Sequence, residues 1–277
     1  MNVNDPRTTP ARPDLAADHL KGQVQAASFV EGRKMTIARG RASLRNSPAH
    51  DAVQDNELLF GEAITVFESR FGWAWCQSAF DNYVGYLHSI AVCDPVKPDH
   101  RVVALSTPLL TGPDLKLPAR DMLPFNAKVR VQRRASGYAL IEQGGYVFEG
   151  HLAPLEFKAP DWVATAERFV GTPYVWGGNT HAGLDCSGLL QVALAGSGIA
   201  VPRDADMQEA ALSEDCTGSP RQRGDIVFWN GHVGIMLDAE RMIHANAFHM
   251  QVETEPLLQA VERITPVAGA VTSIKRL

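Results

Sequence analysis

Short β-type runs recur in the same order in two stretches of this sequence, and this recurrence limits the fold more than any other feature. Each stretch holds an alternating run, a run that starts at Gly and an aromatic residue, and a closing run around Tyr and Gly. The runs are 63–67, 72–76 and 82–87 in the first stretch and 128–132, 137–141 and 145–150 in the second. Strands of this length, separated by turn residues, are typical of small barrels or sandwiches. The pattern predicts two related all-β units at 35–94 and 100–157, with unrelated β-meanders as the alternative.

The pattern changes from Asp161 onward. Apolar residues at helical spacing predict a short amphipathic helix, and a second apolar face follows a Gly-rich loop, with Asp185 available as its N-cap. The two faces consist of Trp162, Ala166, Phe169 and Val170, and of Leu189, Leu190, Ala193 and Leu194. Three strands are then expected, at 225–229, 232–237 and 242–246. Helices followed by antiparallel strands are typical of an α+β domain, which we place at 160–277.

Composition and charge exclude several classes of protein. With 277 residues, 45% of them hydrophobic, the chain can bury a substantial core. The formal charge of -5 is spread along the chain and gives no basis for binding nucleic acid or an anionic membrane surface. No apolar stretch approaches the ~20 residues that span a bilayer. Residues 1–18 do not resemble a secretory signal, so we expect a disordered lead-in within a tail at 1–34 and a cytoplasmic protein, with a periplasmic or secreted location as the alternative.

Cys186 is the candidate nucleophile. It follows Asp185 at the expected first turn of a helix, where unpaired N–H groups and the positive end of the helix dipole favour a thiolate over a thiol. A buried structural cysteine is the alternative, and we assign that role to Cys76, Cys93 and Cys216. The wide spacing of the cysteines indicates neither a disulfide framework nor a metal motif and favours a reducing compartment.

His232 and His244 are the candidate partners of the thiol. The imidazole is the only side chain with an unperturbed pKa near neutrality, so one ring can take the thiol proton while the second orients the first. A two-residue loop at 239–240 would place the two rings on opposite faces of the hairpin. An odd loop such as 238–240 pairs His244 with Gly234 and puts both rings on one face. We therefore predict an odd loop or a bulge.

Other interpretations of these residues remain open. His232 could be a solvent-facing strand residue, and Asn246, on the same face as His244, could orient the base instead. A zinc site is a further alternative, although the cysteine and the two histidines lack the close pair of ligands typical of such sites. We expect His181 and His249 to be surface residues, and we expect no metal or other cofactor.

Six short motifs carry a family resemblance. In chain order they are 171–178 (Gly-Thr-Pro-Tyr-Val-Trp-Gly-Gly), 185–188 (Asp-Cys-Ser-Gly), 201–203 (Val-Pro-Arg), 223–225 (Arg-Gly-Asp), 232–234 (His-Val-Gly) and 243–245 (Ile-His-Ala). Together they closely resemble the NlpC-type cysteine peptidases, over about 160 to 250, and the two β units resemble the bacterial SH3-like barrels that flank cell-wall enzymes. The resemblance implies a papain-like fold, a Cys-His-His triad and cleavage of the γ-D-glutamyl bond to a diamino acid in peptidoglycan stem peptides.

The resemblance also implies roles for residues around the nucleophile. Tyr174 would lie beside the sulfur and assist the oxyanion, or would simply pack with Trp176. Asp185 and Ser187 would bind the D-glutamyl portion of the substrate, and Asp185 would cap the helix as well. Arg203 would bind a substrate carboxylate or form a structural ion pair.

The chain departs from the family pattern at Ala205, where many relatives carry a serine. A substrate-binding hydroxyl is therefore missing, and Asp204 or Asp206 would compensate for it. The departure puts the fine substrate preference in doubt and leaves the chemistry intact.

Two β units without a visible signal are similar to the recycling members of the family, which take murein peptides with a free N-terminal L-Ala. In those relatives an acidic residue of the first barrel caps the substrate amine. Glu62 matches that position, with Tyr83 as its neighbour, unless Glu62 is a solvated turn residue. We thus expect a monomeric γ-D-glutamyl-L-diamino acid endopeptidase that binds stem peptides. The alternatives are a wall-binding protein with an inactive peptidase domain, and an amidase or acyltransferase of the same fold.

Overall fold

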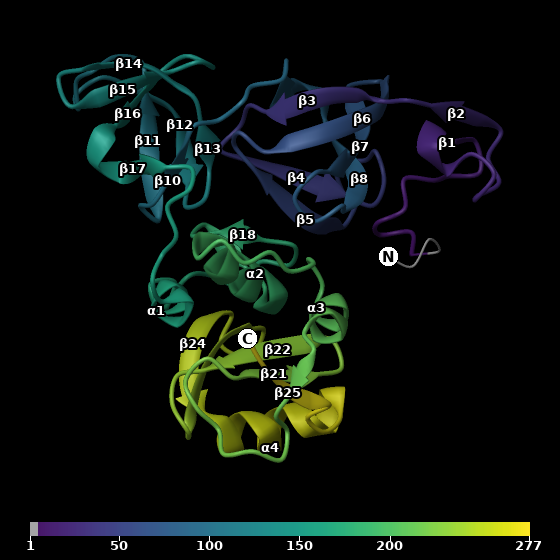
Figure 1. Ribbon diagram of the computed structural model, residues 1–277, viewed down its shortest axis with the longest axis vertical. Coiled ribbons are helices and arrows are strands. Elements are labelled where there is room, and N and C mark those ends of the chain that lie inside the picture. Colours follow the sequence, from purple (N-terminus) through teal and green to yellow (C-terminus); the bar gives the residue numbers. More distant parts are fainter. Residues whose placement is uncertain (1–4) are drawn as a thin grey trace. The chain divides into compact units, whose positions relative to one another are not determined.

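The computed structural model describes residues 5–277, and the chain divides into two compact units, Met1–Glu156 and Phe157–Leu277 (Figure 1). The first unit is built of strands joined by turns and short 3-10 helices, and the second combines helices with an antiparallel sheet. The expected fold class, an α+β domain preceded by an all-β part, is confirmed. Within the described residues no helix is both long and apolar enough to cross a membrane.

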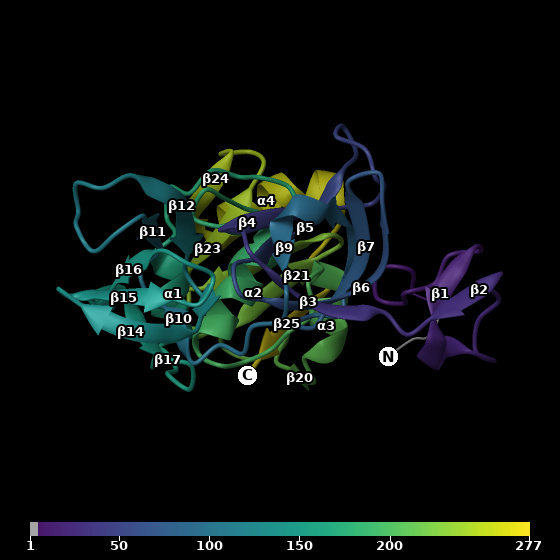
Figure 2. The ribbon, with the colours of Figure 1, turned by 90° about the horizontal axis from the view of Figure 1, so that it is seen from above.

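The N-terminal segment is ordered from Asp5 onward, which corrects the expectation of a disordered lead-in; residues 1–4 lie outside the described part of the chain. Strand β1 (Leu15–Ala17) pairs in parallel with β2 (Ser28–Val30) (Figure 2). The 3-10 helix η1 (Asp18–Leu20) follows β1 directly along the chain. Leu15, Ala17 and Leu20 pack against Phe67 and Trp75 of the first barrel.

Arg12 anchors this segment. Its guanidinium lies 4.4 Å from the centre of the Trp75 ring and donates to the Tyr86 hydroxyl at 2.9 Å. It also forms ion pairs with Asp14 at 2.8 Å and with Glu68 at 2.9 Å. A stacked, doubly paired guanidinium stabilises the ordered segment although its composition is polar.

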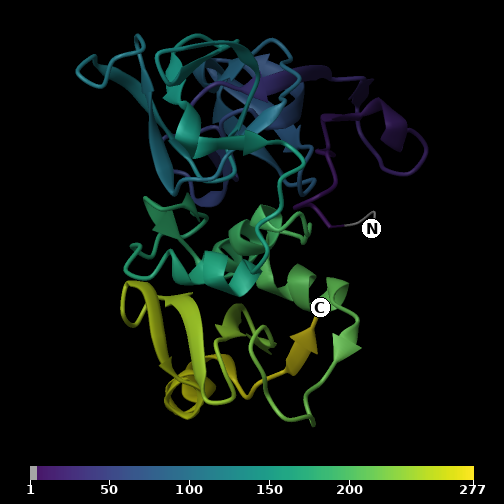
Figure 3. The same cartoon turned by 60° about the vertical axis from the view of Figure 1, so that its left-hand side comes forward.

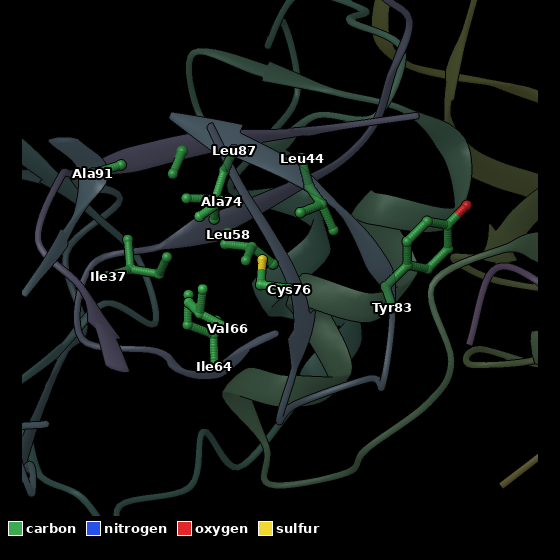
Figure 4. Close-up of a cluster of buried hydrophobic side chains, with 11 residues drawn as sticks. Ile37, Leu44, Leu58, Ile64, Val66, Ala74, Cys76, Tyr83, Leu87 and Ala91 are labelled. Carbon is green, nitrogen blue, oxygen red and sulfur yellow. The ribbon is translucent and has the colours of Figure 1, made fainter. Parts of the chain in front are cut away.

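The first barrel is a seven-stranded sheet in the order β5-β4-β8-β7-β6-β3-β9. Its strands are β3 (Arg33–Ile37), β4 (Arg41–Arg45), β5 (Gln54–Leu59), β6 (Ala63–Arg70), β7 (Trp73–Ser78), β8 (Val84–His88) and β9 (Val92–Cys93), with η2 (Ser89–Ala91) before β9. Inward-facing side chains form one core, shown in Figure 4, that contains Ile37, Leu44, Leu87 and also Tyr83.

The second set of strands forms the rest of the first unit. Its strands are β10 (His100–Val102), β11 (Ser106–Leu110), β12 (Ala119–Pro124), β13 (Lys128–Val129), β14 (Val131–Ala135), β15 (Tyr138–Ile141), β16 (Tyr146–Phe148) and β17 (Leu152–Pro154), with η3 (Glu149–His151) before β17. They build the sheets β12-β11-β16-β15-β14 and β13-β10-β17. The antiparallel succession β14-β15-β16 repeats that of β6-β7-β8, as the recurring runs predict.

Gly61 marks a close approach between these two sets of strands. The N–H of Lys128 donates to the carbonyl of Phe60 at 2.8 Å, and a Cβ at Gly61 would lie 1.8 Å from the carbonyl oxygen of Lys128. Its φ of +79° also favours glycine. The backbone around Glu62 is therefore held by both sets of strands.

The second unit contains a six-stranded sheet in the order β20-β25-β21-β22-β23-β24. Its elements are α1 (Trp162–Glu167), β18 (Asn179–Thr180), β19 (Gly183–Leu184), α2 (Cys186–Gly196), α3 (Ala205–Ala211), β20 (Glu214–Asp215), β21 (Ile226–Trp229), β22 (His232–Met236), β23 (Arg241–Asn246), β24 (Gln251–Pro256), α4 (Leu257–Ala268) and β25 (Ser273–Arg276). Helix α2 packs against α1, β22 and β23, and α4 packs against β24 and the sheet's core; Figure 3 shows α4 in yellow. The start of α2 is thereby brought to the hairpin β22–β23.

Candidate active site

Cys186 is the first residue of α2, as the sequence predicts. Asp185 caps the helix, because its side chain accepts the N–H of Gly188 at 2.7 Å. The same carboxylate accepts the N–H of Gly177 at 2.8 Å, from the loop that precedes the helix. One side chain thus holds the backbone on both sides of the nucleophile.

The sulfur of Cys186 lies against β22. Strand β22 pairs with β23 at Ile235–Ile243 and Met236–Met242. Nearer the start of β22, the backbone N–H of Val233 faces the sulfur of Cys186. Val233 directly follows His232, so the sulfur lies beside the backbone that carries the candidate base. Within residues 5–277 no hydrogen bond joins the sulfur to either imidazole; contacts of this kind commonly tighten only in the substrate complex.

Burial decides the protonation state of this thiol. It raises the pKa of Cys186 to about 12, and the charge of Asp185 acts in the same direction, against the N–H groups of Val233 and Ser187. The expectation of a resting thiolate is therefore wrong. Burial has a larger effect on the pKa of Cys186 than the helix start has, so Cys186 keeps its proton until a base removes it.

The hairpin β22–β23 has the register that the sequence predicts. The pair Met236–Met242 leaves an odd loop centred on 238–240, and the same register sets His244 opposite Gly234. Both rings lie on one face, with Nε2 of His232 2.8 Å from Nδ1 of His244. The predicted odd loop is confirmed.

Both imidazoles are neutral at ordinary pH. Burial lowers the pKa of His232 to about 3, and the positive charge of Arg263 acts in the same direction. Burial also lowers the pKa of His244, which is completely buried, although Glu255 opposes the shift. A neutral imidazole beside a neutral thiol is the state from which a base can take a proton.

Glu255 was not predicted from the sequence. Its Oε1 lies 2.6 Å from Nε2 of His244 and also accepts from Arg263 of α4. Glu255 lies on β24, two positions from Glu253, which pairs with His244 in the ladder. The alternation of Glu253 and Glu255 in a short strand was the available signal, but only the pairing of β23 with β24 brings Glu255 to the ring.

Asn246 has a different partner from the one considered. Its Oδ1 accepts from the backbone N–H of His249 at 2.8 Å and lies 3.1 Å from Nδ1 of the same residue. The partner of His232 is His244. His249 and His181, expected at the surface, are both half-buried.

Arg203 is the structural partner of Asp185. It is 1% exposed, and its Nη1 and Nη2 donate to the two Asp185 oxygens at 2.9 and 2.6 Å. Nη1 also donates to Oγ of Ser187 at 2.8 Å. Of the two roles considered for Arg203, the ion pair is the one present, because a buried guanidinium that holds a carboxylate is closed to a second one. Asp185 and Ser187 belong to the same buried network.

Tyr174 is half-buried and lies close to the nucleophile. Burial raises the pKa of Tyr174, and the charge of Asp185 raises it further, so the hydroxyl keeps its proton. The departure at Ala205 falls on the first residue of α3, which is 7% exposed, and Asp204 precedes it without capping the helix by its side chain.

Glu62 and Tyr83 lie in the first unit, and both are buried. Oε2 of Glu62 accepts the N–H of Leu59 at 3.0 Å. Burial raises the pKa of Glu62 to about 7, although the charge of Lys128 opposes the shift. Glu62 is therefore no solvated turn residue, and a buried carboxyl with so raised a pKa is typical of a functional position.

The remaining cysteines are separate from this arrangement. Cys76 and Cys216 are buried and Cys93 is half-buried, and all are free thiols. In the part of the chain that the structure describes, no three His, Cys, Asp or Glu side chains converge as a metal site requires.

Replacing Arg203 with glutamine should lower the free energy of unfolding by about 3 to 5 kcal/mol, because Asp185 would remain as a buried, unpaired charge. Urea unfolding at neutral pH measures the loss. Arg223→Gln is the matched control, since the half-exposed Arg223 pairs with Asp161 and Glu167 at the surface and should cost less than about 1 kcal/mol. Similar losses in both variants would contradict the role of Arg203.

Alkylation of Cys186 should accelerate about tenfold per pH unit between about pH 6 and about pH 9, because the thiolate fraction rises in this proportion below the pKa. Peptide mapping after iodoacetamide treatment separates Cys186 from Cys93. A rate that is already at its plateau in mild acid would show a resting thiolate and contradict the assignment.

Comparison with known proteins places this geometry in a family. Residues 171–263 match the NlpC/P60 family, and residues 44–92 match the bacterial dipeptidyl-peptidase Sh3 domain. Dipeptidyl-peptidase 6 of Lysinibacillus sphaericus is 36% identical over 95 residues, which are 34% of this chain and 35% of that protein. Gamma-D-glutamyl-L-lysine dipeptidyl-peptidase of Bacillus subtilis is 24% identical over 237 residues, which cover 76% of this chain and 78% of that protein.

A solved structure extends the likeness to the fold. The crystal structure of an NlpC/P60 family protein from Bacillus cereus superimposes with a TM-score of 0.73 at 19% identity and covers 88% of this chain and 99% of that one. This chain spans about a third of the length of the Lysinibacillus relative. The chain therefore contains an NlpC/P60 domain, which holds the Cys-His-His arrangement, and a bacterial Sh3 domain in the first unit.

Proposed function

We propose that this chain is a cysteine endopeptidase that hydrolyses the γ-D-glutamyl-L-diamino acid bond of peptidoglycan stem peptides. One observation carries the proposal: a thiol at the start of α2 lies against β22, the strand whose His232 begins a hydrogen-bonded row of two imidazoles and a carboxylate. A nucleophile, a base and a group that orients the base are what acyl transfer through a covalent intermediate requires. The relatives named for dipeptidyl-peptidase activity support the type of bond.

In the acylation step, His232 takes the proton of Cys186 while the sulfur attacks the γ-carbonyl carbon. The bond to the diamino acid nitrogen then breaks, the imidazolium gives its proton to the leaving amine, and a thioester remains on Cys186. Backbone N–H groups at the start of α2 and the protonated hydroxyl of Tyr174 are the donors for the oxyanion. Water then attacks the thioester with His232 again as base, and the free acid leaves as the thiol is restored.

We assign the free amine of the substrate to Glu62, and the substrate itself to free murein peptides with N-terminal L-Ala, as in cell-wall recycling. A buried carboxyl with little compensating charge is stabilised when an ammonium group binds it. Tyr83 is a buried aromatic residue of the same barrel. The match of residues 44–92 to a dipeptidyl-peptidase Sh3 domain supports a substrate role for this barrel.

Reduced protein should release L-Ala-D-Glu from L-Ala-γ-D-Glu-L-diaminopimelate or from the L-lysine analogue. Cys186→Ala should abolish release, because no nucleophile remains, while Cys93→Ser should keep the wild-type rate. Mass spectrometry of the products measures the reaction and separates it from an amidase, which would cut elsewhere. Failure of the wild type to release the dipeptide, or full activity of Cys186→Ala, would exclude the proposal.

The KM for a free-amine peptide should fall as the pH rises through about 7, because the carboxylate form of Glu62 becomes populated while the substrate amine is still protonated. Glu62→Gln should raise KM at least about tenfold, equivalent to about 1.4 kcal/mol, and should remove this pH dependence. The exposed Glu31→Gln is the control. An N-acetylated peptide should not be turned over, and equal rates on acetylated peptide or intact murein would exclude an amine-binding role.

A further inference from the structure

We infer that Glu255 is a positioning residue that fixes the tautomers of both imidazoles, so that Nδ1 of His232 is the atom that receives the Cys186 proton. The inference rests on the proposed function for the reaction itself, and its physical content, the proton positions on the two rings, can be measured without a substrate. It deepens the proposal by naming the atom that acts as base and the charge that directs it.

The carboxylate of Glu255 determines where the protons of the row lie. Burial pushes the pKa of Glu255 upward, but the hydrogen bond with His244 and the charge of Arg263 hold the pKa below its usual value. Glu255 is therefore ionised and can only accept hydrogen bonds. Since its Oε1 lies 2.6 Å from Nε2 of His244, that nitrogen must carry the proton.

The proton on Nε2 determines the rest of the row. A neutral imidazole has one donor and one acceptor nitrogen, so Nδ1 of His244 is an acceptor. Its neighbour at 2.8 Å is Nε2 of His232, which must then be the donor. The same rule leaves Nδ1 of His232 with a lone pair. A single carboxylate two rings away thus selects the nitrogen that can act as base.

Glu255 also stabilises the charge that forms during the reaction. When the thiol proton moves to His232, the new imidazolium donates toward His244, which in turn donates to the carboxylate. No bond changes beyond the transfer of one proton from sulfur to nitrogen. An interaction that strengthens as charge develops accelerates the reaction, whereas equal binding of both states does not.

Arg263 acts on the row with the opposite sign. It reaches Glu255 from α4 and stacks over Phe248 at 4.5 Å, and its positive charge lowers the pKa of both imidazoles. Glu255 raises the pKa of both rings. Within residues 5–277, His249 after β23 also acts on His244, and Glu253 on β24 pairs with His244 in the ladder. Removing the charge of Glu255 and removing the charge of Arg263 should therefore shift the pKa values of the imidazoles in opposite directions.

Long-range ¹H–¹⁵N correlation spectra of the histidine rings test the inference without substrate. In the wild type both His232 and His244 should be Nε2–H tautomers at neutral pH. Glu255→Gln should lose this restriction, because a carboxamide can donate to Nε2 as well as accept from it. Glu253→Gln, which removes a carboxylate from the same strand, should leave both tautomers unchanged. An Nδ1–H tautomer at His232 in the wild type would overturn the inference by itself.

Titration of the same spectra gives a test of sign. Arg263→Gln should move the appearance of the His232 imidazolium to higher pH, and Glu255→Gln should move it to lower pH. If Glu255 had a merely structural role, the pH at which the His232 imidazolium appears would move in the same direction in both variants or in neither. Either result would contradict the inference.

Turnover of the free-amine peptide supplies the catalytic readout. Glu255→Gln should lower kcat at least about tenfold with KM within about twofold, because the lost interaction acts only when charge develops on His232. Glu253→Gln should retain the wild-type kcat. If no variant and no wild type hydrolyses the peptide, the proposed function fails while the spectra still decide the tautomers. If the peptide is hydrolysed and the spectra show the other tautomer, the function stands and the role of Glu255 is wrong.

Discussion

The position of the nucleophile depends on the carboxylate of Asp185. Its oxygens accept the N–H groups of Gly177 and Gly188 and pair with the buried Arg203. In a medium of low dielectric such a network stabilises strongly when it is complete and costs several kcal/mol, roughly 3 to 5, when one partner is removed. Because the two N–H groups belong to the loop before Cys186 and to the helix after it, the sulfur is held between two fixed pieces of backbone.

Desolvation sets the chemistry that this position allows. The helix start and the N–H of Val233 favour the anion, but burial is stronger, so Cys186 rests as a thiol and His232 as a neutral base. In the proposed reaction, the reactive pair forms only when a proton moves from the thiol to the ring. The row of His244 and Glu255 would then stabilise the charge that this transfer creates. Rigid placement and neutral resting states also protect a thiol from adventitious reaction.

Local patterns predicted what depends on local contacts. The first alternating run lies in β6, and the second is divided between β13 and the start of β14. The runs that begin at Gly and an aromatic residue overlap β7 and β15, and the odd loop at 238–240 placed both imidazoles on one face. Alternation has a period of two in any strand, so register follows from counting. The contacts of Arg12 could not be predicted in this way, because its partners Trp75 and Tyr86 are more than sixty positions away along the chain. A polar segment was therefore mistaken for a disordered one.

Helix caps and strand parity are properties of neighbouring residues, so sequence patterns alone predicted a cysteine at a helix start and two histidines on one face of adjacent strands. The chemical state of these side chains follows from the tertiary structure. The protonation of Cys186, the closure of Arg203 into an ion pair and the arrival of Glu255 at His244 all depend on how much water is excluded and on which strand lies beside which. Solvent exclusion and strand order depend on contacts between distant parts of the chain, so no local sequence pattern predicts them.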